Sequence, residues 1–238
     1  MGLQFFYHPD GVDASHAVLH PEESFHCVRV CRLKKGDRIG LTTGNGHTAL
    51  GRIAEVQDER HVVVEILPGT EKFHPSPLQA VHLYVSILQD TSRMEWLTEK
   101  AAELGAISIQ WLICRRTVKK HLRIDRLQRI ALAALKQSGR PYRMHVAEPV
   151  PLAELARPNG LILWAHCEAG SFTMEKILRN HKKSQFRHLF IGPEGDFTPE
   201  ETQSALDWGA HPLSLGPWRL RSETAALAAI SLLAALDE

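Results

Sequence analysis

The sequence predicts an α/β protein with two parts: a small β-barrel over residues 1–72 and a helix-covered parallel sheet over residues 73–238. Three observations lead to this prediction. Short β-branched runs separated by turns fill the first part. Strand-like and helix-like segments alternate in the second part, which is typical of a parallel sheet with helices on its faces. Between the two parts, Pro68-Gly69 and the prolines Pro75 and Pro77 indicate a linker.

The first part is expected to contain one helix followed by strands. The helix should cover about residues 21–30. The strands should run from Arg38 to Thr42, from His47 to Val56 and from Arg60 to Leu67. Gly44-Asn-Gly46 separates the first two strands, and Asn-Gly between apolar runs is a hairpin signal. This pattern of strands and turns predicts the small barrel.

The second part is expected to alternate between strands and helices. Apolar runs predict strands over residues 81–88, 107–113, 161–165 and 188–191. Capping and breaking signals predict the helices between and after them. The expected helices are one opened by the capping box Ser92-Arg-Met-Glu95 and closed by Gly105, one over 124–137, one opened by the capping box Thr198-Pro-Glu-Glu201, and one over Ala225–Leu236.

Composition favours a folded protein of a reducing compartment. Hydrophobic residues make up 44% of the 238 residues, enough for a core. The longest nearly apolar run, Ala225–Leu236, is too short to cross a bilayer, and no signal-peptide pattern is visible, so we expect a cytoplasmic protein with no membrane partner. The four cysteines form no C-x-x-C pair, so free thiols are expected and no metal site.

Basic residues are clustered although the net charge is only +1. Residues 26–38 contain Arg29, Arg32, Lys34, Lys35 and Arg38 against the single acid Asp37. Residues 115–129 contain seven basic residues against Asp125 alone. A solvated helix face is the ordinary explanation for any single strip. Two strips on a nearly neutral chain favour RNA or DNA, gripped at chosen places.

The loop Gly192-Pro-Glu-Gly195 follows a predicted strand and precedes a predicted helix. In open α/β sheets, ligands bind in such loops at the carboxyl ends of strands. The acids Glu194 and Asp196 oppose a phosphate, and neither a P-loop nor a dinucleotide fingerprint occurs in the chain. A ligand with hydroxyls, an amine or a cationic centre fits better, and S-adenosylmethionine has all three. The alternative is an ordinary strand-to-helix turn.

A second loop, Leu215-Gly-Pro-Trp-Arg-Leu-Arg-Ser-Glu-Thr224, places two arginines and a carboxylate before an apolar helix. An arginine at an active site can stabilise an oxyanion or hold a phosphate through its planar guanidinium. The alternative is an ion pair of Arg219, Arg221 and Glu223 at the surface.

With these two loops the chain resembles the RsmE family of bacterial methyltransferases, which modify N3 of a uridine in small-subunit (16S) ribosomal RNA. Three further segments resemble the family in the same order along the chain, and together they span nearly its whole length. These segments are Phe25–Asp37, Arg93–Gly105 and Lys136-Gln-Ser-Gly-Arg140.

The resemblance implies a fold that periodicity does not predict. It implies an N-terminal PUA-like β-barrel and a C-terminal SPOUT domain, in which the chain end is threaded through a loop to make a deep trefoil knot. Such threading is an exception to the usual rule for chain connections. The resemblance also implies that the knot loops hold S-adenosylmethionine and that the protein is a homodimer with the pocket near the subunit interface.

The same resemblance implies roles for individual residues. Three loops are expected to bind the cofactor, mainly through main-chain groups, with Glu194 orienting the ribose or the amine. The expected cofactor-binding residues are Leu163, Ala165, His166, Glu168, Ile191, Gly192, Pro193, Glu194, Gly195, Leu215, Gly216, Leu220 and Thr224.

For catalysis, the N3 proton of the target must leave before or during attack on the methyl group. Arg221 is expected to stabilise the resulting anion, and Glu223 is expected to orient Arg221 or accept the proton. Ribosomal RNA, as free RNA or within the assembled subunit, is the expected partner. The residues expected to contact it are Arg29, Arg32, Lys34, Lys35, Arg93, Arg115, Arg116, Lys119, Lys120, Arg140 and Arg219.

Three positions depart from the family pattern. Asp196 stands where the family often has glycine, Trp218 where it often has arginine, and Gln4-Phe-Phe precedes Tyr7-His8 where an arginine is common. These departures bear on the details of the substrate more than on the cofactor. Two alternatives are open. The chain could be another SPOUT methyltransferase, acting on transfer RNA or on a ribose hydroxyl, or a knotted RNA-binding protein without catalysis.

Overall fold

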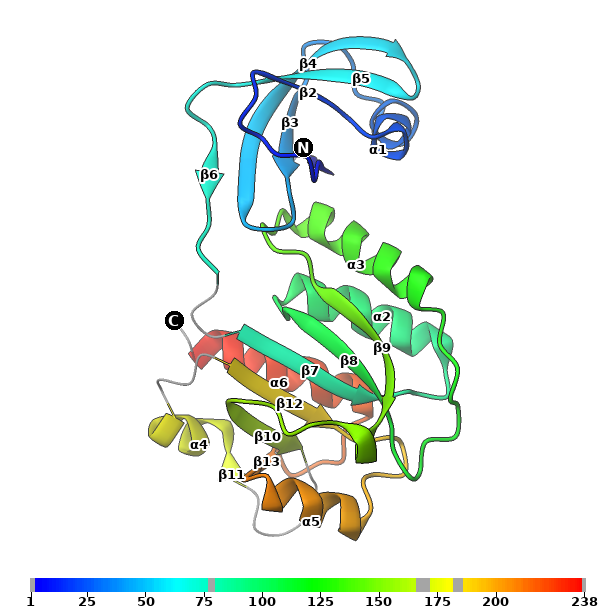
Figure 1. Ribbon diagram of the computed structural model, residues 1–238, viewed down its shortest axis with the longest axis vertical. Helices are drawn as coiled ribbons and strands as arrows, with labels where there is room; N and C mark the ends of the chain where they lie inside the picture. Colours follow the sequence, from blue (N-terminus) through cyan, green and yellow to red (C-terminus); the bar gives the residue numbers. More distant parts are fainter. Residues whose placement is uncertain (1–2, 77–79, 166–171, 182–185, 237–238) are drawn as a thin grey trace. The chain divides into compact units, whose positions relative to one another are not determined.

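The computed structural model describes residues 3–76, 80–165, 172–181 and 186–236. Contacts divide the chain into two units (Figure 1). The N-terminal unit consists of Met1–Ser76 with Leu132–Arg143, and the C-terminal unit consists of Pro77–Ala131 with Met144–Glu238. The boundary expected between residues 72 and 73 stays a prediction, and no sequence signal indicated that residues 132–143 belong with the first segment.

The N-terminal unit is built on one mixed sheet. Its strands are ordered β1-β3-β4-β5-β2, with β6 also paired to β4. Strand β1 runs parallel to β3, and the other pairings are antiparallel. The strands are β1 (Phe5–Tyr7), β2 (His16–Val18), β3 (Arg38–Thr42), β4 (His47–Asp58), β5 (His61–Ile66) and β6 (Lys72–Phe73).

All three strands and the hairpin expected in this region are present, as β3, β4 and β5. The expected helix is present as α1 (Pro21–Phe25), which continues as a π-helical segment, His26–Val30. The strands β1, β2 and β6 are two or three residues long, too short to show a period in the sequence. The core contains Phe6, Val12, Ala17, Leu19, Cys27, Ile39, Leu41, Ala49, Ile53, Val62, Val64 and Ile66.

Specific contacts hold residues 132–143 in this unit. The Lys136 ammonium pairs with Glu23 at 2.6 Å, and both side chains are largely buried. The Tyr142 hydroxyl donates to the carbonyl of His74 at 2.7 Å. Gly46 has φ +106, and a Cβ added there would lie 2.5 Å from the Tyr142 hydroxyl. The turn therefore requires glycine both for its conformation and for its close contact with this segment.

The C-terminal unit contains a parallel sheet ordered β11-β13-β10-β12-β7-β8-β9. Its inner strand β10 is apolar on both faces, because helices cover the sheet. The strands are β7 (Ala80–Ser86), β8 (Ser108–Ile113), β9 (His145–Pro151), β10 (Leu161–Ala165), β11 (Phe172–Thr173), β12 (Phe186–Ile191) and β13 (His211–Ser214).

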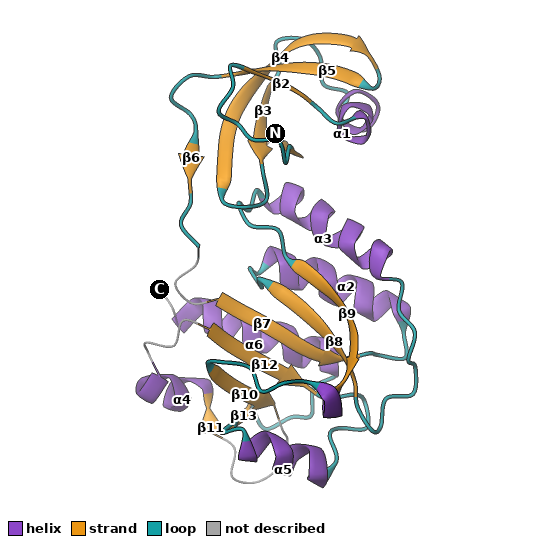
Figure 2. Ribbon diagram, in the orientation of Figure 1, coloured by secondary structure: helices purple, strands orange, loops and turns teal. Residues whose placement is uncertain are grey.

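Helices lie on opposite faces of this sheet (Figure 2). Helix α6 contacts β7, β12 and α2. Helix α5 lies on the other face, where its Ala205 shares a core with Trp164 of β10 and Phe190 of β12. The helices are α2 (Thr91–Glu103), α4 (Met174–His181), α5 (Pro199–Asp207) and α6 (Ser222–Leu236), together with α3 (Ile124–Ser138), which begins in this unit and whose residues from Leu132 onward belong to the N-terminal unit. Among the described residues, no helix has the length and apolarity needed to cross a membrane.

Helix starts show where local signals succeed and fail. The capping box Thr198–Glu201 at the start of α5 is confirmed. The capping box expected at Ser92 is wrong, because α2 begins at Thr91 and the carboxylate of Asp90 accepts the N–H of Ser92. Helix α6 begins at Ser222, before the expected Ala225, because its first turn is polar and the sequence signal was apolar composition.

Strands containing proline were also missed. β9 includes Pro149 and Pro151, yet it is an edge strand, where a missing N–H is tolerated. β13 includes Pro212 between two neighbours, but β11 pairs only with Leu213 and Ser214. The missing N–H of Pro212 therefore breaks no pairing with β11.

Candidate functional site

A cavity of about 480 Å³ lies at the carboxyl ends of three adjoining strands, β10, β12 and β13, and at the start of α6. This is the edge at which open parallel sheets bind ligands. The cavity is lined by Ala165, Ile191, Gly192, Pro193, Glu194, Asp196, Leu213, Ser214, Leu215, Gly216, Pro217, Trp218, Arg219, Leu220, Arg221, Ser222 and Ala225.

The first wall is the loop Gly192–Gly195, which neighbouring segments hold from several sides. The buried hydroxyl of Ser222 donates to the Gly192 carbonyl at 2.8 Å. The Glu194 carboxylate accepts the N–H of Gln89 at 3.0 Å. The Arg116 guanidinium donates to the Gly195 carbonyl at 2.7 Å. This loop is therefore fixed before any ligand binds.

Asp196, which lines the cavity just after this loop, has the positive φ of 64° that glycine favours. Its N–H donates to the Pro193 carbonyl at 2.9 Å, and its carboxylate accepts the N–H of Phe197 at 2.8 Å. Aspartate is among the few residues that adopt this conformation, partly because its side chain bonds nearby backbone. The departure from glycine at this position therefore keeps the turn and adds a carboxylate to the cavity wall.

The second wall is the loop Leu215–Leu220 between β13 and α6. Gly216 has φ +122, which a residue with a Cβ rarely adopts. Trp218 exposes 80% of its surface. The Arg219 guanidinium donates to the Glu194 carbonyl at 3.4 Å, which connects this loop to the first wall.

The two expected catalytic residues face different surroundings. Arg221 is exposed and lines the cavity. Glu223 is buried, and its carboxylate lies 3.7 Å from Nε of Arg93 in α2. Arg93 also lies 3.8 Å from Asp90, whose pKa is lowered by hydrogen bonds from the side chain and N–H of Ser92. Glu223 thus pairs with Arg93 and not with Arg221.

The expected cofactor-binding residues fall into three groups. Eight of them line the cavity: Ala165, Ile191, Gly192, Pro193, Glu194, Leu215, Gly216 and Leu220. Leu163 is fully buried within β10, and Gly195 and Thr224 are exposed beside the cavity lining. His166 and Glu168 lie outside the described residues.

Seven lining residues were not among the expected site residues: Asp196, Leu213, Ser214, Pro217, Trp218, Ser222 and Ala225. Leu213 and Ser214 belong to β13, whose proline hid the strand. Ser222 and Ala225 lie one turn apart at the start of α6, on the face that meets the cavity. The polar stretch before the apolar helix was the signal that could have revealed them.

The basic residues expected to bind RNA in the N-terminal unit are mostly at the surface. Arg29, Arg32, Lys34 and Lys35 are exposed. Arg29 pairs with Glu59, and Arg32 has φ +55. Arg140 differs, because it is partly buried and this burial lowers its pKa.

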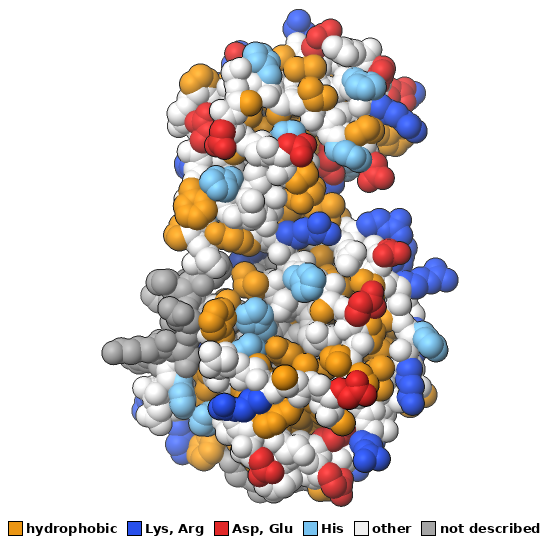
Figure 3. Space-filling model, viewed as in Figure 1, with side chains coloured by type: hydrophobic (Ala, Val, Ile, Leu, Met, Phe, Trp, Pro, Cys, Tyr) orange, Lys and Arg blue, Asp and Glu red, His pale blue; other side chains and the backbone are white. Residues whose placement is uncertain are grey.

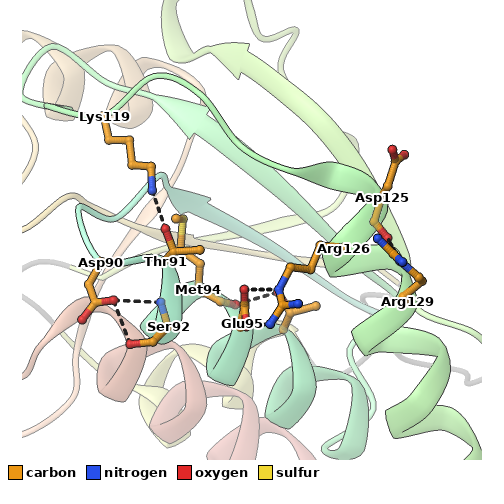
Figure 4. Close-up of polar contacts among 10 residues, drawn as sticks. Asp90, Thr91, Ser92, Met94, Glu95, Lys119, Asp125, Arg126 and Arg129 are labelled. Atoms are coloured by element: carbon orange, nitrogen blue, oxygen red, sulfur yellow. Dashed lines mark hydrogen bonds and ion pairs between the residues drawn. The ribbon is translucent and has the colours of Figure 1, made fainter.

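In the C-terminal unit, Arg115, Arg116, Lys119 and Lys120 lie between β8 and α3. Figure 4 shows that Lys119 of this segment and Arg126 of α3 form hydrogen bonds with residues near the start of α2. Lys119 donates to the hydroxyl of Thr91 at 2.6 Å, and Arg126 makes two hydrogen bonds to the Glu95 carboxylate, one of 2.7 Å. The hydrogen bond from Arg126 lowers the pKa of Glu95.

On the face of the C-terminal unit seen in Figure 3, basic side chains are scattered singly among acidic and hydrophobic ones. That face offers no broad basic surface. Arg116 and Arg219 are basic residues that donate hydrogen bonds to the loop Gly192–Gly195.

The sheet order and the cavity define an α/β protein that can hold a small ligand at the carboxyl ends of its strands. Two family descriptions match the chain. "RNA methyltransferase domain" matches residues 74–234, and "RNA methyltransferase PUA domain" matches residues 19–67. The first match covers more than half of the chain, so the protein belongs to this RNA methyltransferase family.

Relatives and solved structures agree with the family match. A ribosomal RNA small subunit methyltransferase E of Aquifex aeolicus is 29% identical, covering 91% of this chain and 93% of the relative. A Legionella pneumophila protein solved with bound SAM has 30% identity and a TM-score of 0.86, covering 99% of this chain and 98% of that one. A ribosomal RNA small subunit methyltransferase E from Neisseria gonorrhoeae, bound to S-adenosyl methionine, has 27% identity and the same TM-score and coverage.

Proposed function

We propose that this RNA methyltransferase uses S-adenosylmethionine to methylate N3 of a uridine in small-subunit ribosomal RNA. The observation that carries the proposal is the cavity at the ends of β10, β12 and β13, with the guanidinium of Arg221 in its wall and no partner for it among the described residues. The small-subunit ribosomal RNA methyltransferases that resemble the chain over most of its length support the substrate class.

The cavity fits this cofactor in size and chemistry. Its volume of about 480 Å³ lies within the usual range of ligand pockets, about 300–1,000 Å³. Apolar side chains such as Ile191, Leu213 and Leu220 suit an adenine ring, and the main chain at Gly192 and Gly216 suits its edge. The carboxylates of Glu194 and Asp196 suit the hydroxyls and the positive charge of the cofactor. When bound, S-adenosylmethionine supplies the methyl group.

Residues of the protein would then stabilise the negative charge that develops on the target base. Loss of the N3 proton leaves negative charge that is shared with the uracil oxygens. Arg221 is placed to stabilise this anion, because its guanidinium lines the cavity and has no carboxylate partner among the described residues. Glu223 would act at a distance, since its pairing with Arg93 holds the first turn of α6, which directly follows Arg221.

The finer features of the fold belong to the same proposal. We infer that the N-terminal unit is a PUA-like barrel and that the C-terminal unit carries a trefoil knot at the cavity. The insertion of β13 between β11 and β10, followed by the return of α6 to β7 and β12, supports the knot. We also infer a homodimer, and a cytoplasmic location because ribosomal RNA is found there. Sedimentation velocity tests the dimer.

Two experiments test the function. Calorimetric titration of the full chain with S-adenosylmethionine should show binding in the micromolar range, and no binding with RNA present would refute the enzyme. Mass spectrometry of ribosomal RNA should show loss of small-subunit N3-methyluridine in a deletion strain and its return with the wild-type gene. Persistence of the nucleoside in the deletion strain, or loss of a transfer RNA or 2′-O-methyl mark instead, would show that the substrate assignment is wrong.

A further inference from the structure

The rim of the cavity carries an aromatic ring that no role described above uses. Trp218 is 80% exposed, the highest value among the exposed large hydrophobic residues of the described chain. The chain has five tryptophans, and two of the others, Trp111 and Trp164, are almost fully buried. An exposed indole loses the free energy that burial would give it, so its position at the mouth of a ligand cavity points to a partner.

The loop presents this ring in a constrained way. Gly216 with φ +122 and then Pro217 precede Trp218, and Ser222 anchors the end of the loop to the buried Gly192 carbonyl. The ring therefore stands on a short segment that is fixed on both sides. Such a segment loses less entropy on binding than a flexible one would.

The charges beside the ring favour a polyanion. Arg219 and Arg221 follow Trp218 closely in sequence and line the same cavity. Neither has a carboxylate partner among the described residues, and Arg219 reaches only the carbonyl of Glu194.

Arg116 approaches the next carbonyl of that loop, that of Gly195. Two guanidiniums thus bracket adjacent peptide groups of the loop Gly192–Gly195. One of them, Arg219, directly follows Trp218 in the chain, so the loop that presents the ring also presents positive charge.

We propose that Trp218 is a stacking platform for an unpaired base of the RNA substrate, with Arg219 and Arg116 holding the adjacent phosphates. This inference rests on the proposed function and deepens it by naming a residue that grips single-stranded RNA. Aromatic rings next to arginines are the common means of holding unstacked bases. A second copy of this chain fits less well, because a twofold interface centred on the rim would bring Arg219 and Arg221 against their own copies.

The direct test needs neither the cofactor nor turnover. The affinity of the full chain for a short single-stranded oligouridylate is compared with its affinity for an abasic oligomer of the same length. Trp218→Ala should weaken oligouridylate binding by about 5- to 100-fold, the usual range for losing one stacked base. It should leave abasic binding nearly unchanged, and Trp218→Phe should restore much of the loss.

Trp96 provides the matched control, because it is 46% exposed on α2 and does not line the cavity. Trp96→Ala should bind both oligomers like the wild type. In this variant, quenching of tryptophan fluorescence by oligouridylate should report mainly on Trp218, since Trp111 and Trp164 are buried and Trp208 is partly buried and does not line the cavity.

Three outcomes would overturn the proposal. The first is equal loss of oligouridylate and abasic binding in Trp218→Ala, and the second is no loss of either. The third is a shift of Trp218→Ala to a smaller species in sedimentation, which would assign the ring to a subunit contact. Failure of the proposed function is a separate result, because cofactor titration and ribosomal RNA analysis decide it. A wild-type chain could bind oligouridylate through Trp218 and still fail both.

Discussion

The two loops that form the cavity are held in different ways. The loop Gly192–Gly195 receives hydrogen bonds from Ser222, Gln89 and Arg116, which come from three separate segments. The loop Leu215–Leu220 has contacts of 3.4 Å through Gly216 and Arg219 and presents exposed side chains. The first loop is held in place by hydrogen bonds from three segments. The second loop has fewer contacts and presents exposed side chains to an incoming partner.

This difference predicts how substitutions should divide. Changes to the residues that support the first loop should lower stability and cofactor affinity together. Changes to exposed residues of the second loop and of the adjoining turn of α6 should lower methyl transfer or RNA affinity and leave stability nearly intact. Each prediction below tests one side of this division.

The largest effect is expected from Arg221→Ala. Removing a donor that stabilises a developing anion commonly lowers the rate by about 100- to 1,000-fold. Single-turnover methyl transfer should therefore fall by roughly that factor, while calorimetric affinity for S-adenosylmethionine stays within about threefold of wild type. Thermal melting should change little, because Arg221 is exposed.

Arg221→Lys is the control for charge. It keeps the positive charge but lacks the planar guanidinium, so it should recover part of the rate. A parallel fall of rate, cofactor affinity and melting temperature in Arg221→Ala would show that Arg221 supports the structure and would break the comparison between the loops.

The second effect concerns the pair of Arg93 and Glu223. The Glu223 side chain is 9% exposed and that of Arg93 is 31% exposed. Arg93→Ala would leave a nearly buried carboxylate without its partner, which should lower the free energy of unfolding by about 1–3 kcal/mol in denaturant titration. The Arg179–Glu175 pair on α4 is exposed on both sides, so Arg179→Ala should cost less than about 1 kcal/mol.

Arg93 was expected from the sequence to bind RNA, and the same variant separates the two roles. If Arg93 positions α6, then the exchange Arg93→Glu with Glu223→Arg should recover stability lost in either single variant, as a double-mutant cycle would reveal. If Arg93→Ala weakens RNA binding with unchanged stability, the positioning role is wrong.

The features of the fold that could be predicted from the sequence are those that depend on interactions between residues close together in the chain. Alternation of apolar runs and capping signals is local, and it located β7, β8, β10, β12 and α5. The family resemblance indicated both cavity loops. The order of strands in the sheet, with β13 beside β10, depends on packing between distant segments and no local pattern encodes it.

The site shows the same limit. Glu223 and Arg221 are two residues apart, which suggested that they act together. In the structure Glu223 pairs with Arg93, whereas Arg221 lies just before α6 and has no carboxylate partner among the described residues. Arg93, the actual partner of Glu223, is distant in sequence, and the family resemblance led to its expected role in RNA binding.

An effect on stability similar to that of Arg93→Ala is expected from Ser222→Ala, because Ser222 supports the loop Gly192–Gly195. The substitution removes the 2.8 Å hydrogen bond to the buried Gly192 carbonyl. Leaving such a group unsatisfied costs about 1–3 kcal/mol, so both cofactor affinity and the free energy of unfolding should fall. Ser204 on α5 also donates to a backbone carbonyl but is exposed, and Ser204→Ala should change neither quantity measurably. Unchanged cofactor affinity in Ser222→Ala would show that cofactor binding does not depend on the hydrogen bond from Ser222 to the Gly192 carbonyl.

The smallest effect concerns acid and tests a part of the sheet away from both loops. The rings of His82 in β7 and His188 in β12 stack with centroids 5.2 Å apart, and burial lowers the pKa of both, with His188 lowering that of His82 further. The folded pKa values of both rings lie below the ordinary histidine value. At pH values between the folded and the ordinary pKa, the unfolded chain therefore binds more protons than the folded chain. This contribution to stability is therefore complete above about pH 6.5 and declines as the pH falls toward the folded values.

The melting temperature should drop on acidification through this window, and His188→Gln should reduce the drop. The remaining decline would come from other histidines with lowered pKa values, His8, His26 and His211. His145→Gln, at an exposed position, should keep the wild-type profile, and an equal change in both variants would show that the stacked pair is not the source.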